Sequence, residues 1–124
     1  MYFFYVVPLP PNTPVTNPVI MLEPIQAGLL TFMEVEFPLR CEGLAKLKIK
    51  YNTKQIVPFN PPGWLYGDNR VFKLDLNYSI DDPPYQLEFI GYNEDDTYLH
   101  TLTVGVMVQS IIHKPFEDLI MEAV

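Results

Sequence analysis

Side chains that could take part in catalysis are few and scattered. The chain has one cysteine, Cys41, and two histidines, His100 and His113, whereas nucleophilic catalysis needs a nucleophile held beside a base. Arg40 and Glu42 flank Cys41, and their opposite charges offset each other at the thiol. We expect Cys41 to be a buried thiol and His100 to be a structural residue of a strand. No glycine-rich phosphate loop and no Gly-x-Ser-x-Gly motif occurs, so the sequence predicts neither an enzyme nor a cofactor.

A run of oxygen-bearing side chains at residues 93–96 is the candidate for binding a metal ion. Calcium takes oxygen ligands from carboxylates and amides, which makes Asp95 and Asp96 the candidate ligands. The run lacks the alternating ligand spacing of a calcium loop, and runs of this kind are usually solvated turns. We therefore predict no metal site, and Asp95 and Asp96 remain the residues that would bind one.

Three aromatic residues, Phe59, Trp64 and Tyr66, fall in a proline-rich stretch at residues 58–69. Aromatic side chains on a stiff loop give a large contact area at low entropic cost and are frequent at binding hot spots. They are candidate binding residues. The alternative is that Trp64 folds back and plugs one end of the domain, and the sequence favours neither interpretation.

The composition restricts the partners that this chain could bind. Its 124 residues suit one domain, and thirteen prolines argue against long helices. A net charge of −7 disfavours nucleic acid as a partner, because phosphate neutralisation needs a basic surface. No apolar run approaches the roughly 20 residues of a membrane helix. The apolar N-terminal stretch lacks a basic start and is interrupted by prolines, so we expect no signal peptide and synthesis in the cytoplasm.

Hydrophobic alternation predicts an all-β fold. Residues 45–51 alternate Ala, Leu, Ile and Tyr with lysines, which is typical of a strand with one wet face. Similar patterns predict further strands at residues 2–9, 19–23, 29–37, 54–57, 71–80, 85–92 and 98–108. About eight antiparallel strands joined by short and long connections predict a jelly-roll-like β-sandwich over residues 1–110. An immunoglobulin-like sandwich is the second choice.

Both ends of the chain carry apolar residues that need cover. Tyr2, Phe3 and Phe4 belong to a strand that is apolar on both faces, and Phe116, Leu119 and Ile120 form one stripe of a predicted short helix in the tail, residues 111–124. Such a short helix is marginal alone in water. We therefore predict that these six residues lie at an interface with the domain or with a neighbouring copy in a homo-oligomer.

Residues 43–49 (GLAKLKI), 64–69 (WLYGDN) and 91–101 (GYNEDDTYLHT) together resemble the small jelly-roll accessory, or decoration, proteins of capsids and tails in tailed phages and related viruses. The likeness spans most of the chain in layout, without one diagnostic motif. It implies a structural protein of the virion, a homotrimer or another symmetric oligomer that stabilises a lattice through contacts with itself and other virion proteins. The predicted C-terminal helix departs from the family.

A second function class stays open. A carbohydrate- or receptor-binding module could use Trp64 and Tyr66 as a stacking platform for a glycan, with the turn at residues 93–96 holding a calcium ion.

Overall fold

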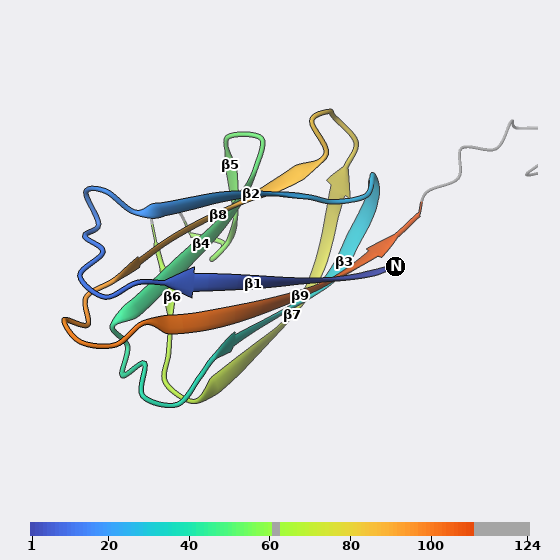
Figure 1. Ribbon diagram of the computed structural model, residues 1–124. Coiled ribbons are helices and arrows are strands. Elements are labelled where there is room, and N and C mark those ends of the chain that lie inside the picture. The colour runs from blue at the N-terminus through green and yellow to red at the C-terminus, as the bar shows by residue number, and fades with distance from the viewer. Residues whose placement is uncertain (61–62, 111–124) are drawn as a thin grey trace, which may run out of the picture.

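The computed structural model describes residues 1–60 and 63–110 of the chain, which form nine β-strands and no α-helix (Figure 1). The strands are β1 (Tyr2–Leu9), β2 (Val19–Pro24), β3 (Gly28–Phe37), β4 (Ala45–Tyr51), β5 (Lys54–Val57), β6 (Leu65–Tyr66), β7 (Arg70–Ile80), β8 (Gln86–Asn93) and β9 (His100–Gln109). Eight of them match the predicted strands to within two residues at each end. The predicted helix lies outside the described residues.

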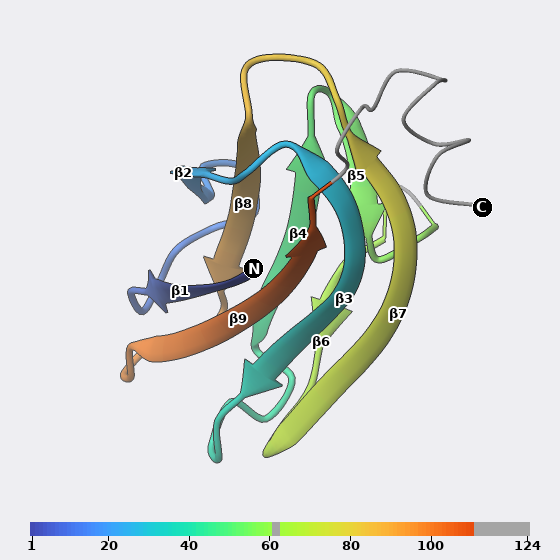
Figure 2. The same ribbon diagram turned by 90° about the vertical axis from the view of Figure 1, so that its right-hand side faces the viewer.

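The strands form two antiparallel sheets that face each other. One sheet has the order β1-β9-β3-β7, and the other has the order β2-β8-β4-β5 with β6 also pairing with β4. Figure 2 shows β1 and β2 together on one side of this sandwich and β5 and β7 on the other. The sandwich therefore has two open sides, each made of one edge strand from each sheet.

The order of pairing is that of a jelly roll. Strand β1 pairs with β9, β2 with β8, β3 with β7, and β4 with β5, so each pair encloses the next along the chain. A long hairpin rolled into two layers gives this nested pairing. The predicted jelly-roll-like sandwich is confirmed, and the immunoglobulin-like alternative is not needed.

Alternation along the strands builds the core between the two sheets. In β4, Ala45, Leu47, Ile49 and Tyr51 are buried, while the lysines between them lie on the outer face, as predicted. The other fully buried side chains include Phe37, Phe89, Leu9, Leu30, Met33, Leu87 and Leu102. Burying such side chains contributes about 1.5–3 kcal/mol each, and this burial drives the assembly of the two layers.

Strand β3 departs from simple alternation at one position. The register shifts between Leu30 and Phe32 against both β7 and β9. Leu30 and Met33 are both fully buried as a result. Simple alternation would place Thr31 on the same face as Met33, but Thr31 lies at the irregularity, where the alternation changes phase.

The sequence analysis treated the proline-rich stretch at residues 58–69 as a loop, but part of it is a strand. It contains the two-residue strand β6, in which Leu65 pairs with Leu47 and Tyr66 pairs with Lys46. A strand this short leaves no periodic signal of its own. Its partner is the exposed length of β4 that β5 leaves unpaired.

Candidate functional site

Strand β1 is an edge strand whose outer face is apolar and exposed. Its odd-numbered residues from Tyr5 onward are buried, whereas Tyr2, Phe4 and Val6 are 49%, 60% and 48% exposed. No side chain of β1 carries a charge. Native proteins usually prevent an edge strand from pairing with another chain by means of charged residues or bulges. The β1 edge lacks such charges, so a strand of another chain could pair with it.

The backbone of β1 is also available at this edge. Met1 and Val108 exchange both of their backbone hydrogen bonds, at 2.6 and 2.8 Å. Hydrogen-bonded and non-hydrogen-bonded residue pairs alternate along an antiparallel ladder. The odd-numbered residues of β1 therefore form their backbone hydrogen bonds with β9. The even-numbered residues therefore direct their backbone groups to the free edge. Tyr2, Phe4 and Val6 each present an N–H donor and a C=O acceptor there.

The apolar surface continues from β1 onto β9. Met107 pairs with Tyr2 and is 39% exposed. The ring of Tyr2 lies over Gly105, where a Cβ atom would overlap the tyrosine hydroxyl, so a glycine is needed for this close approach. We call Tyr2, Phe4, Val6 and Met107 the β1 face. The sequence analysis missed Val6 and Met107, although their alternation with buried neighbours was visible in the pattern.

The structure exposes two of the six predicted interface residues and packs a third against the core. Tyr2 and Phe4 lie on the β1 face, but Phe3 is half-buried, packs against the core and stacks on Tyr5 with the ring centroids 6.5 Å apart. Alternation along the strand turns Phe3 to the opposite face. Phe116, Leu119 and Ile120 lie outside the described residues.

The opposite edge strand of the same sheet, β7, has a polar outer face. Its exposed residues include Lys73, Asp75, Asn77 and Ser79, with Val71 as the apolar exception. Charged side chains of both signs discourage another strand from adding to this edge. The two edges of one sheet thus differ in chemistry, and only the β1 edge favours association.

The aromatic residues near β6 form a cluster on the outer face of the other sheet. The ring of Trp64 meets that of Tyr92 edge-on at 4.7 Å, and the Lys48 amine lies 4.0 Å above the Trp64 ring. Tyr66 is 57% exposed, with the Lys46 amine 5.0 Å from its ring. Trp64 therefore packs on the side of the sandwich and does not plug its end.

We call Trp64, Tyr66 and Tyr92 the aromatic cluster. Lys46 also contacts the Tyr92 ring at 5.8 Å and forms an ion pair with Glu94 at 3.1 Å. Desolvation, followed by the neighbouring Lys50 charge, lowers the pKa of Lys48. Because Trp64 is only partly exposed whereas Tyr66 is 57% exposed, Tyr66 offers the more accessible surface for a flat ligand. Phe59, the third predicted aromatic residue, lies apart from this cluster and is 92% exposed.

The acidic turn at residues 93–96 is held by its own hydrogen bonds. One oxygen of Asp95 accepts from the backbone amides of Thr97 and Tyr98, and the other lies 2.8 Å from His100 Nε2. The hydrogen bond from the backbone amide of Thr97, followed by the hydrogen bond with the His100 side chain, lowers the pKa of Asp95. The Asp95 oxygens that would bind a metal ion thus already have partners, and Asp96 accepts from the Thr97 hydroxyl.

Cys41 is fully buried, as expected. Burial, then the charges of Asp68 and Asp95, raise the pKa of Cys41 to about 11. A thiol with so high a pKa stays protonated near neutral pH and is a poor nucleophile.

Within residues 1–60 and 63–110, no three His, Cys, Asp or Glu side chains lie close enough to hold a metal ion. In the same part of the chain, no helix is long and apolar enough to span a membrane. No protein-family model, curated protein or solved structure matches this chain.

Proposed function

We propose that this protein is a non-enzymatic structural subunit of a virus particle, which joins a second copy of itself through the β1 face. The observation that carries the proposal is the edge of β1: an uncharged strand with exposed apolar side chains and free backbone groups. Jelly rolls are the common fold of viral capsid subunits, and of lectin and cupin domains. Capsid subunits are the class in which self-association is the function.

The β1 edge is complementary to itself. If two β1 strands pair antiparallel about Phe4, Tyr2 of one copy lies opposite Val6 of the other, and Phe4 lies opposite Phe4. The free donors and acceptors of the even-numbered residues then match. Such a contact is isologous and closes as a two-fold pair. No charge on β1 opposes it, although each copy carries a net charge of −7.

The contact between two copies that the β1 edge favours is therefore two-fold, whereas the family resemblance implies a trimer or another symmetric oligomer. The two oligomers differ in mass and are separated by sedimentation equilibrium. Further contacts with other virion proteins would extend the pair into a lattice.

The self-association is tested by placing a charge on the β1 face. We expect the full chain to sediment as a dimer or a larger species and Phe4→Lys to sediment as a monomer, because a lysine at the centre of the contact leaves a buried charge without a partner. Val71→Lys is the matched control, since Val71 is an exposed apolar residue on the other edge strand of the same sheet. A monomeric wild type, or a Phe4→Lys variant that associates like the wild type, would contradict the proposal.

The virion location needs a separate test. Electron microscopy of the native assembly, with an antibody against this chain, should label the surface of particles. Label confined to unassembled protein would overturn the viral part of the proposal and leave the self-association standing.

The second candidate function is glycan or receptor binding by the aromatic cluster. The exposure of Tyr66 beside Lys46 favours it. A glycan array should then give a signal that Tyr66→Ala abolishes and Tyr98→Ala leaves intact, because Tyr98 is 59% exposed but lies in a different turn. An array without signal, or with a signal that survives Tyr66→Ala, would exclude this candidate.

A further inference from the structure

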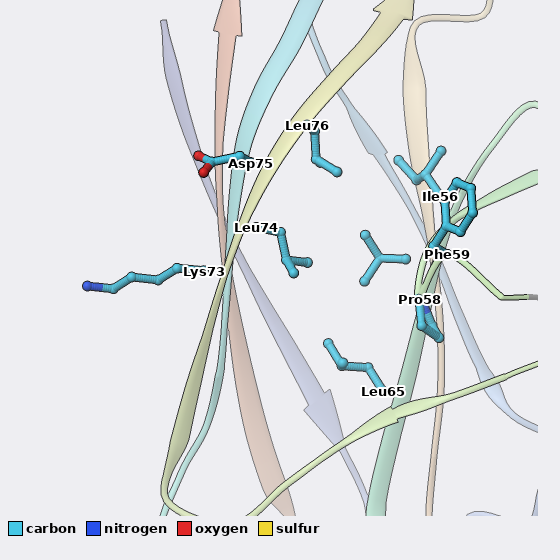
Figure 3. A pocket seen from close by; sticks show the side chains of 9 residues that line it. Ile56, Pro58, Phe59, Leu65, Lys73, Leu74, Asp75 and Leu76 are labelled. Atoms are coloured by element: carbon cyan, nitrogen blue, oxygen red, sulfur yellow. The ribbon is translucent and has the colours of Figure 1, made fainter.

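The side of the sandwich opposite β1 is open and apolar. There β7 of one sheet faces β5 and β6 of the other, and two adjoining hollows of about 390 and 330 Å³ lie between them. Figure 3 shows Leu74 and Leu76 of β7 pointing across the gap toward Ile56, Pro58 and Leu65, while Lys73 and Asp75 point away. The inner side chains of β7 are consequently only half-buried, whereas those of its neighbour β3 are buried. We call this space the β5–β7 cleft.

The cleft has room for several side chains. An apolar cavity of about 150 Å³ accommodates a benzene ring, so each hollow holds at least one large side chain. An apolar space of this kind favours an apolar occupant over water. Phe59 stands at the mouth, lines both hollows and is itself 92% exposed.

We propose that the β5–β7 cleft is the docking site for residues 111–124 of the same chain. The sequence of this segment provides the apolar side chains that the cleft lacks: Phe116, Leu119, Ile120 and Ala123 recur at spacings of three, one and three. The inference concerns a different surface from the β1 face and does not depend on the proposed function.

The described chain ends close to the cleft. Gln109 pairs with Leu29 of β3, and Leu29 pairs with Ser79 of β7. Ser110 therefore lies about two strand spacings, or roughly 10 Å, from the strand that lines the cleft. Phe116 follows six residues later, a length that spans up to about 20 Å when extended. The segment can reach the cleft without leaving its own domain, and this tether gives it an effective concentration on the order of millimolar.

Charge separates this site from the other apolar surface within reach, the β1 face. Of the charged residues that line the hollows, Lys73 and Asp75 point away from the gap. Lys54 also lines the cleft, with its amine 5.5 Å from the Tyr78 ring. The segment carries three acidic residues, Glu117, Asp118 and Glu122, against one lysine, Lys114. The side chains of β1 bear no charge. The segment's combination of apolar and acidic residues thus fits the cleft better than it fits the β1 face.

Photo-crosslinking in the full chain tests this docking. Benzoylphenylalanine replaces Phe116 in the Phe4→Lys background, so the result does not depend on association through β1. We expect irradiation to give an unchanged molecular mass and, after proteolysis, crosslinks to Leu74, Leu76 or Phe59. Benzoylphenylalanine at Tyr98, in a turn outside the cleft lining, is the control and should give no crosslink to these residues.

The remaining outcomes would overturn the inference. They are crosslinks to the β1 face, a product of doubled mass, which would place the segment on another copy, and the absence of any crosslink.

A second measurement uses an apolar dye that fluoresces in apolar clefts. The double variant Phe116→Asp, Ile120→Asp should bind the dye with several-fold higher fluorescence than the Phe4→Lys parent, because the cleft loses its cover. The added change Leu74→Lys should remove that increase. Equal fluorescence of parent and double variant would count against the docking.

Discussion

Asn93 and His100 are the buried polar side chains of the described residues, and both secure the turn that leads into β9. The Asn93 amide donates to the carbonyls of Leu9 and Tyr98, both at 3.0 Å, and its oxygen accepts from the Asp95 amide. One side chain thus ties the end of β1 to the turn between β8 and β9. This tie fixes the register of the strand that carries the β1 face.

The loss of Asn93 should therefore be costly. We expect Asn93→Ala to lower the free energy of unfolding by about 2–3 kcal/mol, because three backbone groups lose their partner, one of them in a buried hydrogen bond. Urea denaturation measures this value. Asn77→Ala, on the exposed face of β7, should cost less than about 0.5 kcal/mol. Equal losses in the two variants would show that the buried network contributes nothing.

Asp95 makes the stability depend on acid pH. Its pKa is lowered in the folded chain, so the carboxylate stabilises the fold above the unfolded-state pKa of about 4 and loses that contribution as the pH falls through the lower folded-state value. The urea midpoint of the wild type should drop between pH 5 and pH 3. Asp95→Asn should drop less over this range, while Asp96→Asn should follow the wild type. If the urea midpoint of Asp95→Asn fell as steeply with pH as that of the wild type, this assignment would be contradicted.

Among the elements, the two-residue strand β6 shows how a short segment is held in place. Its backbone pairs with β4, and Trp64, the residue before it, packs between Lys48 and the Tyr92 ring. Tyr66 at its end is more than half exposed. Trp64 and Tyr66 are close in sequence, yet one fastens the element and the other is free to contact a ligand.

We therefore expect the two aromatic residues to differ in their effect on stability. Trp64→Ala should lower the free energy of unfolding by about 2 kcal/mol, since it loses ring burial, the contact with Tyr92 and the cation–π contact. Tyr66→Ala should change it by less than about 0.5 kcal/mol. Thermal and urea denaturation monitored by circular dichroism provide the comparison. A larger loss for Tyr66→Ala would reverse the roles assigned here.

For the whole molecule, the nested pairing has a kinetic consequence. Strands β1 and β9, the first and the last, lie side by side, so their pairing needs closure of nearly the whole chain. Domains dominated by such distant contacts fold in milliseconds to seconds. Stopped-flow refolding followed by the fluorescence of Trp64, the single tryptophan, should give relaxation in this range. Complete refolding in microseconds would be inconsistent with the topology.

The sequence by itself determined the strands, because burial of one face produces an alternation of apolar and polar residues within each strand. Ala45 to Tyr51 alternate with lysines, and the predicted and observed bounds of that strand agree. Two further features are also local in the sequence: the strand without charged residues at residues 2–9, and the lack of a known catalytic motif. Asp95 and Asp96 could be named as candidate metal ligands, but the hydrogen bonds to Asp95 from Thr97 and His100 could not be read from the pattern.

Only the tertiary structure decided which strands became edges. Whether Phe4 is covered or exposed depends on the strand that lies beside β1, and that partner, β9, is about a hundred residues away. The same holds for Trp64, whose partners come from β4 and β8, and for the β5–β7 cleft, whose walls come from different sheets. Alternation states which face of a strand is apolar, whereas the neighbours that cover that face are chosen by packing between distant segments.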